Sequence, residues 1–120
     1  MEKLIEEVKT LVEAEYGRAS AKFGAVNHSD HESYAILLEE CQEAESECMA
    51  VHDILGYFWN QTKRNDPDQE KFKICQKLQT SAILAACELI QVAAMARKAA
   101  LTISHRTVVT DLTQKGGESV

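Results

Sequence analysis

Residues 82–96 read A-I-L-A-A-C-E-L-I-Q-V-A-A-M-A, and this stretch decides the fold because it is almost wholly apolar. Only Glu88 and Gln91 interrupt it, and Glu88 is the one acid between Glu70 and Asp111. A carboxylate in apolar surroundings costs several kcal/mol unless it is paired or binds a metal ion. We therefore expect Glu88 to have a partner elsewhere in the chain.

The composition indicates one helical domain. The chain has 120 residues, of which 45% are hydrophobic and 27% charged, with one Pro and five Gly, which is typical of a soluble domain with long helices. A net charge of −6 disfavours binding to a nucleic-acid backbone. The four cysteines, Cys41, Cys48, Cys75 and Cys87, form no C-x-x-C pair. We expect buried thiols in a reducing cytosol, without disulfides or zinc.

No segment is expected to cross a membrane. The N-terminus is charged from Glu2 onward and lacks the apolar core of a signal peptide. The one long apolar run is interrupted by Glu88, Gln91, Arg97 and Lys98. A cytoplasmic location is the expectation.

Three periodic segments predict an all-α fold. In residues 2–23, apolar residues recur at three- and four-residue steps, and Gly24 is a natural end. The second segment begins at the capping-box pattern S-D-H-E, residues 29–32. The third begins at Asp66-Pro67, an N-cap followed by proline in the first turn, and has a candidate break at Thr80-Ser81.

The periodicity is lost after Ser104. We therefore predict one domain over residues 1–104 and a partly disordered tail over residues 105–120.

The second and third segments each carry a heptad seam of apolar residues. The seam of the second consists of Leu37, Cys41, Ala44, Cys48, Val51, Leu55 and Phe58. The seam of the third consists of Cys75, Leu78, Ala82, Ala85, Leu89, Val92, Ala96, Ala99 and Ile103, and a further stripe consists of Ile83, Ala86, Ile90 and Ala94. A helix that is apolar on two sides needs more than one neighbour. We expect a long-helix bundle completed by self-association into a homodimer or homotetramer.

Two pairs of polar residues flank these seams at the same offset. Glu40 and Glu43 are three residues apart, as are Glu88 and Gln91, so each pair shares a helix face. Each of the four stands one position before a seam residue, so packing of the seams would bring the pairs together. Carboxylates gathered in this way repel unless a cation lies between them. Oxygen ligands favour Mg²⁺, with Mn²⁺ as the alternative, and such an ion assists phosphoryl or nucleotidyl hydrolysis.

These two motifs and their flanking segments resemble a known superfamily. E-E-C-Q-E at residues 39–43 is similar to the E-E-x-x-E motif of the MazG-like all-α nucleoside triphosphate pyrophosphohydrolases. E-L-I-Q at residues 88–91 stands where that superfamily has E-x-x-D. The flanking segments R-A-S-A-K-F, H-S-D-H-E-S-Y-A and Q-V-A-A-M-A resemble the small phage and bacterial members. The resemblance covers about residues 10–100.

The resemblance implies an activity and a role for each motif residue. The enzyme would be a dimer or tetramer that hydrolyses a nucleoside triphosphate, often a non-standard or deoxy one, to the monophosphate and pyrophosphate with Mg²⁺. Glu40, Glu43, Glu88 and Gln91 match the metal ligands, and Glu39 matches a glutamate with a supporting, water-orienting catalytic role. Because Gln91 replaces an acid, we expect either weaker metal binding than in the family or the loss of one metal of a set.

Three further residues are candidates for substrate binding. Arg18 and Lys22 lie one helical turn apart and would meet phosphates, and Trp59 would stack on a base. The structural alternatives are an exposed basic patch and ordinary packing at a helix end.

The acids also have structural alternatives. In one alternative, the acids around Glu39 to Glu47 form a solvated helix face. In the other, Glu88 pairs with a Lys or Arg of another helix. The competing hypothesis for the whole chain is a catalytically degenerate oligomeric scaffold or interaction protein. The two heptad seams and the missing acid at position 91 support it, and the long segment between the motifs, residues 44–87, is a further departure from the family.

Overall fold

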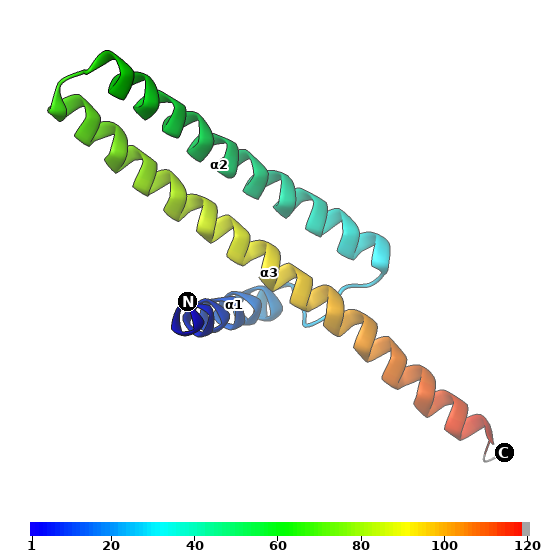
Figure 1. Ribbon diagram of the computed structural model, residues 1–120. Helices are drawn as coiled ribbons and strands as arrows, with labels where there is room; N and C mark the ends of the chain where they lie inside the picture. Colours follow the sequence, from blue (N-terminus) through cyan, green and yellow to red (C-terminus); the bar gives the residue numbers. More distant parts are fainter. Residues whose placement is uncertain (119–120) are drawn as a thin grey trace. The chain divides into compact units, whose positions relative to one another are not determined.

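The protein consists of three long helices, as the sequence predicts. The computed structural model describes residues 1–118 and the side chains of residues 1–107. Helix α1 spans Glu2–Phe23, α2 spans Asp30–Arg64 and α3 spans Asp68–Glu118. No strand occurs within the described residues, so the all-α fold class is confirmed. Figure 1 shows the three helices in chain order.

Helix α3 is continuous across two positions where the sequence pattern suggested an end. It has no break at Thr80-Ser81, and it continues beyond Ser104 to Glu118. The last two residues of the predicted tail, 119–120, lie outside the described residues. The division into a domain over 1–104 and a tail over 105–120 stays a prediction.

The chain forms two compact units. The first contains residues 1–38 together with the chain from Ile90 onward, and the second contains Glu39–Leu89. The boundary runs through α2 and α3, so each of these helices contributes to both units.

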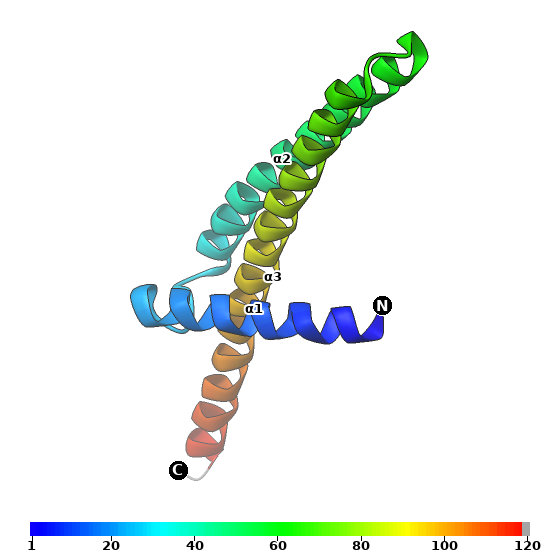
Figure 2. The same ribbon diagram turned by 90° about the vertical axis from the view of Figure 1, so that its left-hand side faces the viewer.

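In the first unit, α1 crosses α3, and several polar contacts join the two helices. Arg97 on α3 forms a salt bridge of 2.6 Å with Glu13, and its guanidinium lies 4.9 Å from the centre of the Tyr16 ring. Gln91 donates a hydrogen bond of 2.6 Å to Glu15. Figure 2 shows this crossing from the side. No residue of α1 is fully buried, and Val12, Tyr16 and Ala19 of its predicted apolar face are half-buried.

A buried polar cluster fixes the connection between α1 and α2. The backbone N–H of Asn27 donates to the Thr102 hydroxyl at 2.8 Å, and the Asn27 amide donates to Ser33 at 2.8 Å. The Thr102 hydroxyl in turn donates to the Lys98 carbonyl at 2.7 Å. All four residues are buried, so buried hydrogen bonds anchor this loop on α3.

Helix α2 begins with a variant of the predicted capping box. The Ser29 hydroxyl accepts the Glu32 N–H at 3.1 Å, as the motif requires. The Glu32 carboxylate accepts the backbone N–H of His28 at 3.3 Å, one residue before the expected donor, and contacts the His28 ring at 2.9 Å. These contacts lower the pKa of Glu32, chiefly through the His28 ring.

In the second unit, α2 and α3 form an antiparallel hairpin joined by a short turn. Asn65 has a positive φ of 57° in that turn. Asp66 binds the Arg64 guanidinium at 2.9 Å, and the Pro67 carbonyl accepts the first helical N–H groups of α3. Buried apolar residues in this unit are Ala44, Ile54 and Ala85.

The seam of the hairpin is rotated relative to the predicted one. The positions with reduced exposure on α2 between 39 and 64 are Glu40, Ala44, Glu47, Ala50, Val51, Ile54, Phe58 and Gln61. On α3 up to Leu89 they are Lys71, Ile74, Leu78, Ser81, Ala85 and Glu88. Ala44, Val51, Phe58, Leu78 and Ala85 were predicted correctly.

The other predicted seam members of this unit are exposed. They are Cys41, Cys48, Leu55, Cys75, Ala82 and Leu89. All four cysteines, including Cys87, are exposed, which corrects the expectation of buried thiols. At each of these six positions the residue one place earlier in the chain lies in the seam. Three carboxylates, Glu40, Glu47 and Glu88, therefore enter the seam, and six apolar residues leave it.

By length and composition alone, one segment has the character of a membrane-spanning helix. It lies in α3 between Asp68 and Thr107, with a mean hydropathy of 1.4 over 18 residues, of which 11% are buried. This corrects the expectation that its charged residues leave no apolar run of sufficient length.

Candidate metal centre

Three of the predicted metal ligands meet in the hairpin unit. Glu40 and Glu43 lie one turn apart on α2, and Glu88 lies on α3. One carboxylate oxygen from each falls within 4.8 Å of the other two. Two oxygens bound to one Mg²⁺ at about 2.0–2.1 Å lie at most about 4.2 Å apart, so a small movement of the side chains would close the triad around an ion. Packing of α2 on α3 thus brings residues 45 or more positions apart in sequence to one place.

Glu40 and Glu88 belong to the seam itself. Both are half-buried, whereas Glu43 is exposed at the edge of the seam. Each of the three acids stands one position before a predicted seam residue, so the sequence predicted that they lie close together. It did not predict that Glu40 and Glu88 are half-buried. The triad is open to solvent on the side of Glu43.

The three carboxylates repel one another. Burial raises the pKa of Glu40, and the charges of Glu43, Glu88 and Glu39 raise it further. Within the part of the chain whose side chains are described, no salt bridge or hydrogen bond to Lys, Arg or His is made by Glu40, Glu43 or Glu88. The alternative in which Glu88 is paired with a basic residue therefore finds no support among the described side chains.

Glu39 lies next to the triad on α2. It is exposed, and its charge contributes to the raised pKa of Glu40. Its role in orienting a water molecule stays a prediction.

Gln91 is engaged elsewhere. It lies in the other unit, where its Nε2 donates to Glu15. Glu15 also accepts hydrogen bonds from Arg18, and the pKa of Glu15 is lowered by Arg18 first and by Gln91 second. Its role as a metal ligand stays a prediction.

Sequence reasoning missed Glu15 altogether. It is one acid among several on α1, and its link to Gln91 spans 76 residues. No local spacing signals such a contact.

Two of the predicted substrate-binding residues lie in the first unit and one in the second. Arg18 binds Glu15, and Lys22 lies 5.1 Å from the centre of the Phe23 ring; both belong to the first unit. Trp59 is 58% exposed, and the centre of its ring lies 5.5 Å from the Lys63 ammonium. It follows Glu43 by sixteen residues on one helix, about 24 Å along its axis. Their roles toward a nucleotide stay predictions.

Comparison with known proteins adds no relative. No family model matches the chain, no curated protein matches it and no solved structure matches it. The functional argument therefore depends on the residues themselves.

Proposed function

We propose that this protein is a Mg²⁺-dependent nucleoside triphosphate pyrophosphohydrolase, with house-cleaning of non-standard nucleotides as its role. The observation that carries the proposal is the triad of Glu40, Glu43 and Glu88, whose carboxylate oxygens lie within 4.8 Å of one another without a basic partner among the described side chains. The resemblance of residues 39–43 and 88–91 to the MazG-like motifs supports the same chemistry.

The donor set fits a hard divalent cation. Three carboxylates supply oxygen ligands and negative charge, and the open edge beside Glu43 leaves room for water and phosphate oxygens. Zinc would favour nitrogen and sulfur ligands, which the triad lacks. Mn²⁺ accepts the same oxygen ligands and is the alternative cofactor.

When bound, Mg²⁺ supplies charge neutralisation at the phosphates and a water molecule activated for attack. The half-buried Glu40 and Glu88 and the exposed Glu43 would hold the ion. Glu39 orients the attacking water. Attack at the α-phosphorus breaks the bond to the β-phosphate, giving the monophosphate and pyrophosphate.

A nucleotide panel tests the proposal. Canonical, deoxy and damaged nucleoside triphosphates are incubated with Mg²⁺ or Mn²⁺, and release of pyrophosphate is measured. We expect turnover of at least one class, lost in Glu88→Gln by 100-fold or more. Glu47→Gln is the matched control, because Glu47 is also half-buried in the seam of α2 but does not belong to the triad. It should retain turnover.

Metal binding gives an independent readout. Calorimetric titration with Mg²⁺ should show binding to the wild type and to Glu47→Gln but not to Glu88→Gln. Unchanged turnover or unchanged Mg²⁺ binding in Glu88→Gln would sink the assignment.

The second candidate is an oligomeric helical scaffold without turnover. The exposed apolar residues of the hairpin unit, among them Leu55, Phe72 and Leu89, favour this interaction role. It predicts no release of pyrophosphate from any nucleotide and a melting temperature that Mg²⁺ leaves unchanged.

A further inference from the structure

The side-chain amide of Gln91 is bound on one side only. Its Nε2 donates a hydrogen bond of 2.6 Å to Glu15, and both residues belong to the first unit. Among the described residues, no group donates a hydrogen bond to the Oε1 of Gln91. The side chain is half-buried, yet this oxygen is not one of the fully enclosed unpaired atoms. Gln91 therefore presents a carbonyl oxygen that a ligand can reach.

Glu15 decides which atom of the amide is presented. The oxygen and nitrogen of a carboxamide exchange places by a half-turn of the last torsion of the side chain, and the hydrogen-bond network selects one of the two states. An ionised carboxylate accepts hydrogen bonds and donates none. Glu15 therefore holds the NH₂ group of Gln91 toward itself and leaves the amide oxygen on the other side.

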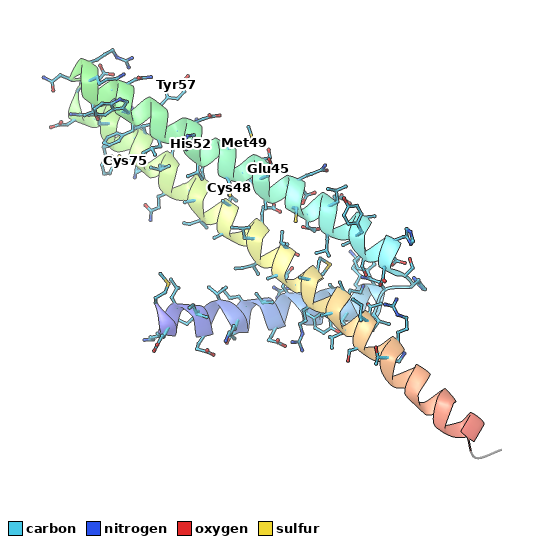
Figure 3. All side chains as sticks on the ribbon, turned by 45° about the vertical axis from the view of Figure 1, so that its right-hand side comes forward. Glu45, Cys48, Met49, His52, Tyr57 and Cys75 are labelled. Carbon is cyan, nitrogen blue, oxygen red and sulfur yellow. The ribbon has the colours of Figure 1, made fainter. Side chains whose placement is uncertain are left out.

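Arg18 holds Glu15 in place. One carboxylate oxygen of Glu15 accepts from Gln91, and the other accepts from the Arg18 guanidinium, whose Nε lies 2.9 Å away. The Glu15 side chain is 21% exposed. Because each of its two oxygens has a donor, this carboxylate has little freedom to turn, and it fixes the orientation of the Gln91 amide. Figure 3 shows the side chains of α1 and α3 where the two helices cross.

A tie between α1 and α3 does not by itself require this arrangement. The salt bridge between Glu13 and Arg97 already joins the two helices at 2.6 Å, and Arg97 also contacts the Tyr16 ring. An amide would tie the helices equally well through its oxygen or through its nitrogen. A carboxylate partner selects one orientation, in which the oxygen is left without a partner among the described residues.

The atom left free is the one that a hard cation binds. Mg²⁺ takes oxygen ligands, and an amide nitrogen is not a ligand for it. Gln91 follows Glu88 by three residues on the unbroken helix α3, the spacing that makes it the predicted fourth oxygen ligand. Outer hydrogen-bond partners orient metal ligands and raise their basicity. Donation from Nε2 to a carboxylate also polarises the amide toward Oε1, which offsets part of the charge that glutamine lacks.

We propose that Glu15, held by Arg18, is a positioning residue that turns the amide of Gln91 so that its oxygen is offered to a divalent cation. Glu15 acts through Gln91 and is not itself a ligand. The inference rests on the proposed function, because Gln91 has a cation to bind only if the acidic triad binds Mg²⁺. It gives α1 a part in metal binding that no sequence motif signals.

Calorimetric titration with Mg²⁺ tests this role. Glu15→Gln keeps the length of the side chain but supplies an amide that both donates and accepts, so Gln91 is no longer held in one orientation. We expect the dissociation constant for Mg²⁺ to rise by about tenfold or more, as is typical when an outer partner of a metal ligand is removed. Glu13→Gln is the matched control, because it removes one negative charge and one contact between the same helices without touching Gln91. It should leave the dissociation constant nearly unchanged.

Two further variants separate positioning from charge. In Gln91→Ala no amide is left to position, so adding Glu15→Gln should have no further effect on Mg²⁺ binding. The exchange variant Glu15→Gln/Gln91→Glu keeps the net charge and reverses the direction of the hydrogen bond, which places a carboxylate oxygen at position 91. It should bind Mg²⁺ at least as tightly as the wild type. Circular dichroism reports whether each variant is helical.

The contact also has a spectroscopic signature. In protein labelled with ¹³C at the side-chain carbonyl of glutamine, the resonance of Gln91 is assigned by its absence from Gln91→Ala. It should shift when Mg²⁺ is added to the wild type but not when Mg²⁺ is added to Glu15→Gln. Gln76, which is exposed on the same helix, is the internal control, and its resonance should stay in place in both proteins.

The outcomes distinguish this inference from the proposed function. If the wild type binds no Mg²⁺, the proposed function fails and the inference fails with it. If the wild type binds Mg²⁺ and Glu88→Gln does not, equal binding by Glu15→Gln and Glu13→Gln overturns the inference alone.

An effect of Glu15→Gln that persists in Gln91→Ala shows that Glu15 acts by its charge and not through the amide, which also overturns the inference. If Glu15→Gln does not fold, the wild type and the exchange variant decide. A Gln91 resonance that Mg²⁺ leaves in place overturns the inference, whereas a shift of that resonance together with Mg²⁺ binding by the exchange variant supports it.

Discussion

The side-chain amide of Gln91 donates a 2.6 Å hydrogen bond to the carboxylate of Glu15, 76 residues earlier in the chain. This contact explains why an amide is tolerated at a position where the resemblance leads one to expect an acid. Glu15 is already ionised and bound by Arg18, so it needs a donor at position 91. An aspartate there would face it with a like charge.

Gln91→Asp should therefore destabilise the protein. The variant loses a hydrogen bond to a charged group and adds carboxylate repulsion, which together cost about 1.5–3 kcal/mol. Urea unfolding at pH 7 measures the change. Gln76→Asp, on an exposed part of the same helix, is the control and should lie within about 0.5 kcal/mol of the wild type.

A double-mutant cycle then isolates the pair. Glu15→Gln removes the negative charge that repels an aspartate at position 91. The double variant should therefore recover much of the stability lost in Gln91→Asp. Additive losses in the cycle would show that the two side chains do not interact in solution.

Glu40→Gln should stabilise the metal-free protein at neutral pH. Burial, and then the charges of Glu43, Glu88 and Glu39, raise the pKa of Glu40 above its ordinary value of 4.5. The folded chain thus binds this proton more tightly than the unfolded chain, so this group makes folding less favourable as pH rises above 4.5. Relief of like-charge repulsion is worth about 0.2–0.5 kcal/mol per pair.

Thermal unfolding in a chelator from pH 3 to pH 8 measures this effect. The melting temperature of Glu40→Gln should exceed that of the wild type at pH 7, and the gap should close well below pH 4.5, where both side chains are neutral. Glu7→Gln, an exposed acid on α1, should show no gap at either pH. A variant that melts below the wild type at pH 7 contradicts the repulsion.

Thr102→Val should destabilise the first unit. The Thr102 hydroxyl accepts the buried N–H of Asn27 at 2.8 Å, and valine leaves that donor without a partner, at a cost of about 1–3 kcal/mol. Thr80→Val is the matched control, because Thr80 also donates to the carbonyl four residues earlier but is exposed. Chemical unfolding should show a larger loss of unfolding free energy in Thr102→Val than in Thr80→Val. Equal losses would contradict a stabilising role for the buried hydrogen bond of the loop.

Arg97→Ala should loosen α1 from α3. It removes the salt bridge to Glu13 and the contact with the Tyr16 ring, worth together about 1–2 kcal/mol for partly exposed groups. Hydrogen exchange should accelerate in α1 while amides of the hairpin seam keep their protection. Arg64→Ala, which breaks only the local pair with Asp66, should leave α1 exchange unchanged.

Much of the site could be predicted because its signals are local. Glu40 and Glu43 share a face through their three-residue spacing, and Glu88 is conspicuous as a lone acid in an apolar helix. Antiparallel pairing of two helices with heptad seams then suffices to bring them together.

The rotation of the seam could not be predicted. Cys41 and Leu89 are more apolar than Glu40 and Glu88, so a rule that buries apolar residues chooses the former, yet the latter lie in the seam. Both stripes are present in the sequence, and apolar character alone does not reveal which of them faces inward.

The sequence by itself determined the three helices, the capping box at Ser29 and the candidate ligands, because periodicity and spacing act within a few turns of one helix. Tertiary structure alone decided which stripe of each helix forms the seam and that Gln91 binds Glu15. Those choices depend on how helices rotate and cross, which is set by packing and charge between residues far apart in the chain.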